Sequence, residues 1–282
     1  VDVDVDGDGP LDLTVTGSQC GALYIFSSSS SQAAGSGGGA GKATFSDLSF
    51  SSVHLRDENG LLDLSCSGGV LGSLVVEGAG RAPSATSPVY RVSLSDLTVS
   101  GALAVDTSSS LDFSMQSCFT GGVRVATGDI DGDGLDSLKV SLASCVSTGG
   151  VSVESSAALD FAADACRSAS VFLKMGDIKS ALPPGTAGLA SSNSVRLSNG
   201  RVLGALTVLG SNSDDQVTVD RMVLSGATAV SLGGGQDRLA VVDSLFARFA
   251  LFSGGNGSDE LTLTRSRFVT TPIVIGFESL SS

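Results

Sequence analysis

Two acidic loops contain the residues best suited to chemistry in this chain of 282 residues. The first loop places four carboxylates at relative positions 1, 3, 5 and 9, namely Asp4, Asp6, Asp8 and Asp12. Glycines follow the second and third of these residues. Such spacing wraps oxygen atoms around a hard cation, and Ca²⁺ takes about six to eight oxygen ligands. The sequence predicts a Ca²⁺ site here, and an acidic turn without metal is the alternative.

The second acidic loop repeats the first half of this pattern with Asp129, Asp131, Asp133 and Asp136. Its ninth position is Ser137, so the fourth carboxylate comes one residue early. Both loops resemble the calcium loops of FG-GAP, thrombospondin type 3 and dockerin repeats over nine residues. The first loop departs from the EF-hand pattern because Val15 stands where the twelfth-position Glu would be. We expect Ca²⁺ in the second loop as well.

A third motif, Gly254-Gly-Asn-Gly-Ser-Asp-Glu-Leu261, resembles the glycine-rich calcium turns of RTX proteins. RTX turns recur about every nine residues, whereas here the motif recurs every 22, so the same cation sandwich cannot form. The favoured interpretation is a tight turn in which Gly supplies positive φ and an Asp carboxylate caps turn amides. A stacked row of Asp215, Asp237 and Asp259 would repel itself, which a cation could relieve.

Internal repetition predicts the fold that positions these loops. Four consecutive 22-residue segments align without gaps from residue 193 to residue 280, and apolar residues alternate within each, as in Val217-Thr218-Val219. Alternation indicates strands with one buried face. Equivalent apolar residues fall in four sets: Val195, Val217, Leu239 and Leu261; Leu197, Val219, Val241 and Leu263; Val202, Leu224, Phe246 and Phe268; Val208, Val230, Phe252 and Val274. We predict an all-β, right-handed parallel β-helix of about 22 residues per coil, with equivalent side chains stacked.

The pattern continues towards the N-terminus with less regularity, which gives roughly 11 coils in one domain spanning 1–282. Long coils carry insertions near 27–41, 77–88 and 176–192, after which the register resumes. Asp112, Lys139, Asp160 and Arg196 are expected to share one outward strand position, where alternating charges favour the register.

The five cysteines do not form a metal-binding pattern. Cys118, Cys145 and Cys166 are expected on the core position that Val202 and Leu224 occupy later, as small buried residues. A disulfide between neighbouring coils remains an alternative. His54 is the single histidine and is expected at the surface, so zinc sites and Ser-His-Asp or Cys-His catalysis are disfavoured. We expect no enzymatic activity.

Charge and hydropathy limit the classes of partner and the cellular location that this chain can have. The formal charge of −13 argues against nucleic acid, whose binding requires many basic residues. Such acidity suits an extracellular protein or a cation binder. There is no run of 18 apolar residues to span a membrane, and a chain that begins at Val1 is interpreted as a processed or trimmed product.

Residues 193–275 resemble secreted bacterial surface proteins with repeated G-x-D-x-V-x-V-x-x-S-x-F coils, of the kind abundant in planctomycetes. The resemblance implies an extracellular or cell-surface repeat protein without catalytic residues. We expect a calcium-stabilised structural subunit that self-associates head to tail into a filament or surface layer, because terminal coils without caps expose pairing edges. The alternatives are an adhesin that binds glycans or cells, and a pectate-lyase-like polysaccharide-degrading enzyme. The near absence of Trp and Tyr disfavours the enzyme.

Overall fold

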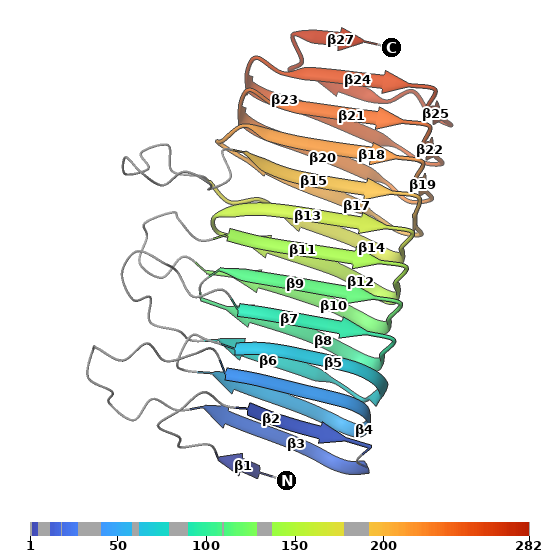
Figure 1. The fold of residues 1–282 in the computed structure, drawn as a ribbon. Helices are drawn as coiled ribbons and strands as arrows, with labels where there is room; N and C mark the ends of the chain where they lie inside the picture. The colour runs from blue at the N-terminus through green and yellow to red at the C-terminus, as the bar shows by residue number, and fades with distance from the viewer. Residues whose placement is uncertain are drawn as a thin grey trace, which may run out of the picture.

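The computed structural model describes residues 2–4, 12–17, 19–27, 41–57, 62–78, 90–108, 110–128, 137–177 and 192–281. Its strands form one hydrogen-bonded network in which every pairing between strands of successive coils is parallel. Figure 1 shows the coils stacked into a rod. The near strands run towards the right-hand edge and the far strands run back as the chain climbs, which makes the winding right-handed. The predicted right-handed parallel β-helix is therefore confirmed.

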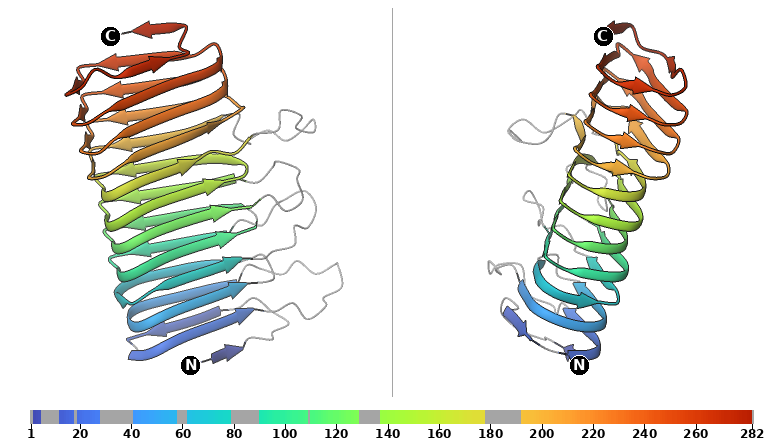
Figure 2. Two further views of the ribbon diagram at one scale, coloured as in Figure 1. Left: turned by 180° about the vertical axis from the view of Figure 1, so that it is seen from behind. Right: turned by 90° about the vertical axis from the view of Figure 1, so that its right-hand side faces the viewer.

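Two long sheets and a narrow edge make up the wall of the rod, as the two views of Figure 2 show. The first face contains β2 (Asp12–Thr16), the start of β4 (Gly41–Asp57), β5 (Leu62–Leu71), β7 (Tyr90–Ser95), β9 (Leu111–Gln116), β11 (Ser137–Ala143), β13 (Ala158–Asp164), β15 (Asn193–Ser198), β18 (Asp215–Asp220), β21 (Arg238–Val242), β24 (Glu260–Thr264) and β27 (Ser279–Ser281).

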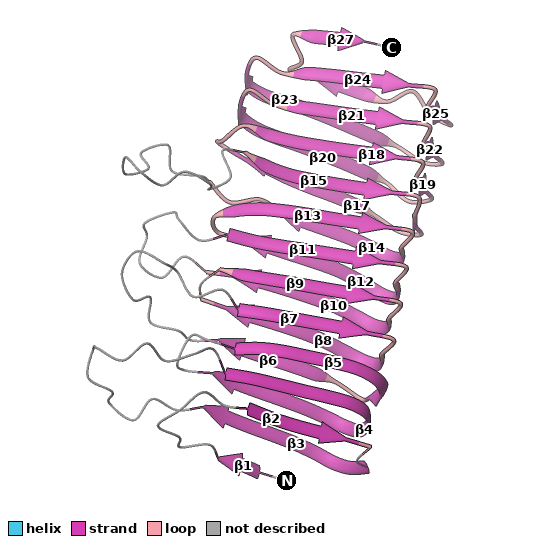
Figure 3. Ribbon diagram, in the orientation of Figure 1, coloured by secondary structure: helices cyan, strands magenta, loops and turns pink. Residues whose placement is uncertain are grey.

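The second face contains β1 (Asp2–Asp4), β3 (Gln19–Ser27), the end of β4, β6 (Leu74–Gly78), β8 (Thr98–Thr107), β10 (Phe119–Thr127), β12 (Val146–Ser155), β14 (Arg167–Lys174), β17 (Leu206–Ser211), β20 (Thr228–Gly235), β23 (Ala250–Gly257) and β26 (Ile273–Ile275). The narrow edge contains the short strands β16 (Arg201–Val202), β19 (Val223–Leu224), β22 (Leu245–Phe246) and β25 (Arg267–Phe268). In Figure 3 strands cover all three walls, and the described residues include no helix. No membrane-crossing helix is therefore found in this part of the chain.

The register of the C-terminal coils follows the 22-residue repeat. Val217 pairs with Val195 before it and with Leu239 after it, and Leu239 pairs with Leu261. The other three apolar sets stack in the same way. Earlier coils alternate between short and long, since Ala43 pairs with Leu64 but Phe161 pairs with Val195. The register resumes after each long coil, as predicted. The predicted insertions themselves, apart from their outermost residues, lie outside the described residues.

The core is a continuous column of aliphatic and aromatic side chains between the two faces. Phe45, Phe113, Phe161, Phe246 and Phe252 are almost completely inaccessible to solvent. Phe246 stacks on Phe268 with ring centroids 4.6 Å apart and meets Phe252 edge-on at 5.7 Å. Like residues lie over like because the coils repeat, so each side chain fills the space left by its neighbour in the next coil.

A left-handed residue turns each coil from the first face towards the narrow edge. Gly17 and Gly68 hold this position in two coils, with φ of 61° and 66°. In the others φ lies between 47° and 55° although the residue is not glycine: Asp47, Asp96, Ser117, Ser144, Ala165, Asn199, Arg221, Asp243 and Arg265. In seven of these nine positions the amide of the turn residue donates to a carbonyl of the next coil, the exceptions being Asp47 and Arg265. Ser117, for example, donates to the carbonyl of Ala143, and Arg221 donates to that of Val242. This hydrogen bond offsets the conformational cost of positive φ for a residue with a side chain.

Charges alternate in register along the outer side of the first face. Lys42, Asp63, Arg91, Asp112, Lys139 and Asp160 pair successively through their backbones. The predicted neighbours Asp112, Lys139 and Asp160 are confirmed. The assignment of Arg196 to this row is wrong, because Asp160 pairs with Ser194 and Arg196 pairs with Ala162. Opposite charges on adjacent strands favour this pairing over one in which a strand is displaced along its neighbour.

Candidate functional site

The predicted calcium loops lie largely outside the described residues. Asp4 ends β1 and Asp12 begins β2, where it pairs through its backbone with Lys42. The remaining predicted ligands lie outside the described ranges: Asp6, Asp8, Asp129, Asp131, Asp133 and Asp136. Within those ranges no group of three or more His, Cys, Asp or Glu side chains is arranged to hold a metal. Both calcium loops therefore stay predictions.

The row of carboxyl groups predicted beside the glycine motifs lies inside the solenoid, and its first member is an asparagine side chain. Asn193, Asp215, Asp237 and Asp259 occupy one position on four successive coils, and each is no more than 1% exposed. This buried row lies where the second face turns back into the first. Sequence reasoning found the stacking of the three aspartates but missed their burial and the contribution of Asn193.

Each member of the buried row accepts a hydrogen bond from the coil before it. The amide of Asp215 donates to Oδ1 of Asp237 at 2.8 Å, and the amide of Asp237 donates to Oδ1 of Asp259 at 3.0 Å. The amide of Asp259 donates to Oε2 of Glu278 at 2.7 Å. At the other end, Asn193 accepts from the amide of Leu159 at 2.8 Å. The side chains thus satisfy backbone groups that the corner removes from the sheet ladder.

Asn193 shows how a neutral side chain fits this row. Its Nδ2 donates to Oδ1 of Asp215 at 2.6 Å and to Oγ of Ser211 at 3.1 Å. Oδ2 of Asp215 also accepts from the amide of Ser211 at 2.7 Å, which confirms the predicted carboxylate cap on a turn amide. By contrast, one carboxyl oxygen each of Asp237 and Asp259 is buried without a hydrogen-bond partner among the described residues.

Glycines make the turn beside the buried row possible. Gly233 and Gly255 lie one coil apart and adopt φ of 101° and 110°. A Cβ on Gly255 would collide with the backbone oxygen of Gly233. The positive φ predicted for glycines of the RTX-like motif is therefore confirmed, but the tight turn over these glycines is not. Residues 254–257 form the end of β23 and pair with the preceding coil, and the turn to β24 is made at Ser258 and Asp259.

Burial changes the protonation of the row. The pKa of Asp237 is raised to about 7, chiefly by loss of hydration and also by the neighbouring carboxyls of Asp215, Asp259 and Asp214, against the hydrogen bond from the amide of Asp215. Burial likewise raises the pKa of Asp215, against the hydrogen bonds from Asn193 and Ser211. Asp215 and Asp237 therefore hold a proton more readily than exposed aspartates do. A groove of about 430 Å³ runs outside it, lined by Asp237, Asp259 and Glu278 among others.

Removing the charge of Asp237 is expected to stabilise the protein at high pH. A pKa raised from 3.8 means that the folded state binds the proton more tightly than the unfolded chain. This contribution is complete below about pH 4 and is lost as pH rises through about 7. At pH 8, Asp237→Asn should gain about 1–3 kcal/mol in the free energy of unfolding, since one pKa unit corresponds to about 1.4 kcal/mol.

Urea unfolding at pH 4 and pH 8 measures the effect as the difference between wild type and variant. Exposed Asp160, replaced by Asn, is the matched control and should show less than about 0.5 kcal/mol of change at either pH. An Asp237→Asn variant that is destabilised equally at both pH values would contradict a protonated acid at this position.

The cysteines occupy a different row from the one predicted. Val202 pairs with Ser168, two residues after Cys166, so the assignment of the cysteines to the Val202 position is wrong. The reason is that Phe161, and not Leu159, stacks on Val195. The row that contains the cysteines follows the left-handed bend and comprises Cys118, Cys145, Cys166, Gly200, Met222, Ser244 and Ser266.

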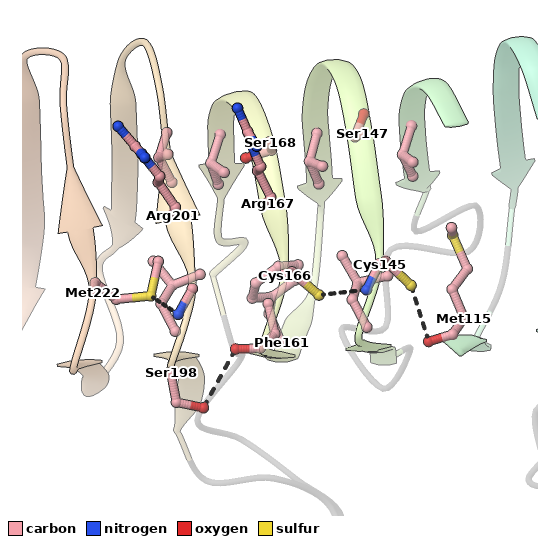
Figure 4. A pocket seen from close by; sticks show the side chains of 18 of the residues that line it. Met115, Cys145, Ser147, Phe161, Cys166, Arg167, Ser168, Ser198, Arg201 and Met222 are labelled. Carbon is pink, nitrogen blue, oxygen red and sulfur yellow. Dashed lines mark hydrogen bonds between the residues drawn. The ribbon is translucent and has the colours of Figure 1, made fainter. Parts of the chain in front are cut away.

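This bend row also accepts amides from the preceding coil. The amide of Gly200 donates to Sδ of Met222 at 3.1 Å, and the amide of Met222 donates to Oγ of Ser244 at 3.0 Å. Cys66, Cys118, Cys145 and Cys166 have free thiols. Burial raises the pKa of Cys66 to about 12, which keeps that thiol protonated and unreactive. Figure 4 shows Cys145, Cys166 and Met222 around a small cavity of about 30 Å³ under the narrow edge.

His54 is partly exposed on the second face, with Nε2 3.4 Å from a carboxylate oxygen of Glu77. The expected surface position is therefore confirmed.

The fold defines the chain as a parallel β-solenoid whose coils are joined at the corners by rows of inward-facing polar and sulfur-containing side chains. No protein-family model, curated protein or solved structure matches the chain.

Proposed function

We propose that this chain is a non-enzymatic structural β-solenoid of the extracellular space or cell surface. Its coils stack head to tail with those of a second copy, and Ca²⁺ in the two acidic loops stiffens the rod. Regular parallel pairing along the whole rod supports a load-bearing role, because each coil contacts only its neighbours.

The last described coil supplies the observation that carries this proposal. Leu280 continues the core row of Val195, Val217, Leu239 and Leu261. Leu261 is completely buried, whereas Leu280 is 66% exposed. Phe268 and Val274 continue two further core rows and are also only partly buried. Apolar surface and strand edges on this coil favour the addition of a further coil, from the same chain or from a second copy.

Leu280→Asp is expected to abolish concentration-dependent assembly, because it places a charge where the next coil would pack. Sedimentation velocity and electron microscopy should show rods for the wild type and monomers for the variant. Val70→Asp is the control, since Val70 is 51% exposed but lies on the side of the rod. That variant should still assemble.

Chelation tests the calcium part separately. Removal of Ca²⁺ should shorten or dissolve the rods while Leu280→Asp stays monomeric with or without the ion. Wild type that remains monomeric at every concentration, with Ca²⁺ present, would rule out head-to-tail assembly.

A surface adhesin is the second candidate. It is favoured by exposed apolar and arginine side chains that form a line along the narrow edge.

A further inference from the structure

Two arginines, at the start of β14 and in β16 of the narrow edge, lie next to each other without a counter-ion among the described residues. Arg167 and Arg201 pair through their backbones on adjacent parallel strands, and both side chains are exposed. In Figure 4 the two side chains extend in the same direction from neighbouring coils. Neither forms an ion pair within the described part of the chain. Arg221 and Arg265, at the nearby bend, bind Asp220 and Asp243 at 2.8 and 2.6 Å.

This placement is unfavourable for the isolated chain. Like charges directly opposite each other on neighbouring strands repel. The protein has 29 acidic residues and only 16 basic ones, yet the ion pairs of the described residues include other arginines and neither of these two. An external anion between them would remove the repulsion. Guanidinium groups bind carboxylates through paired, planar hydrogen bonds, which favours a carboxylate over a spherical ion.

Apolar side chains continue the same line towards the N-terminus. Val146 pairs with Arg167 and is 37% exposed, and Phe119 pairs with Val146 and is 43% exposed. We call Phe119, Val146, Arg167 and Arg201 the edge row. Successive members lie about 4.8 Å apart along the rod, as neighbouring strands do. The row therefore presents an apolar strip followed by two cations in a straight line.

We infer that the edge row binds a carboxylate-bearing polysaccharide that lies along the rod. A uronate carboxylate bridges Arg167 and Arg201, and the C–H face of a neighbouring sugar ring packs on Phe119 and Val146. Such a ligand matches both halves of the row, because each uronate combines an apolar ring face with a carboxylate. The inference does not depend on head-to-tail assembly.

Binding to a matched pair of oligosaccharides tests this inference. Oligo-β-1,4-glucuronate and the corresponding cello-oligosaccharide share a backbone and differ in the carboxylate. Calorimetry at about 0.15 M salt should show binding of the glucuronate and at least tenfold weaker binding of the neutral sugar. Arg167→Gln/Arg201→Gln should weaken glucuronate binding at least tenfold, and Phe119→Ser should weaken it several-fold without any change in charge.

Arg91→Gln/Arg238→Gln is the control, since it removes the same charge from exposed positions on the first face. It should leave affinity within about twofold, and circular dichroism should be the same for all variants. Three results would overturn the inference: equal loss of affinity in both double variants, equally tight binding of a sulfated cello-oligosaccharide, or no glucuronate binding together with lateral association of rods that Arg167→Gln/Arg201→Gln abolishes.

Discussion

Replacement of Phe252 by alanine is expected to lower the free energy of unfolding of the C-terminal coils by about 3–5 kcal/mol. Phe252 is completely buried, and its ring lies 5.7 Å from that of Phe246 and 6.1 Å from that of Phe268. Phe246 belongs to the same coil as Phe252 and Phe268 to the next, so a cavity at Phe252 weakens the contact between coils as well as within one. Neighbouring rings on both sides limit how far the site can collapse.

Hydrogen exchange with mass spectrometry is the appropriate measurement, because a repeat array need not unfold as one unit. Peptides from residues 228–268 should lose protection in Phe252→Ala, while those from residues 90–128 should change little. The control is Leu209→Ala, since Leu209 is 37% exposed on the outer side of the same face. Uniform loss of protection along the chain would contradict coils that stabilise one another locally.

Gly255→Val is the second substitution with a large expected effect, about 3 kcal/mol or more. Positive φ strains a β-branched residue, and the new Cβ would collide with the oxygen of Gly233 in the preceding coil. The strand pairing of Gly233 with Gly255 would have to open. Because the amides of this corner depend on the buried row, loss of the turn should also expose Asp237 and Asp259.

Thermal unfolding followed by circular dichroism checks this result. Gly21 is the control, because a Cβ there meets nothing within 4 Å and its φ is not positive. Gly21→Val should have a midpoint within a few degrees of wild type. A Gly255→Val protein as stable as wild type would mean that the turn differs from the one described.

The sequence was most informative where the repeat has constant length. Val217, Leu239 and Leu261 could be stacked correctly because alternation and a fixed period of 22 define both the face and the register. The prediction failed across the insertion before Val195. Because the length of this insertion is not fixed by the repeat, the sequence does not show which residue of β13 pairs with Val195. An error of two residues keeps the same side chains buried, so the hydrophobic pattern cannot reveal it.

The site was less predictable than the fold. Stacking of Asp215, Asp237 and Asp259 followed from the repeat, but their burial depends on amides of the preceding coil that seek acceptors. The left-handed bend was missed because Gly, Asp, Ser, Ala, Asn and Arg all occupy it, so no residue type marks it. The contact between Arg167 and Arg201 also spans the insertion before Val195, which hid it from sequence spacing.

Stacking of equivalent side chains one coil apart is the central claim, and methyl NMR tests it directly. In protein labelled only at Val and Leu methyl groups, Leu239 should show cross-relaxation with both Val217 and Leu261. Val217 and Leu261 should show none with each other, since two coils separate them by about 9.6 Å, twice the strand spacing. Contacts of Leu239 with neither residue, or a direct contact between Val217 and Leu261, would contradict the solenoid.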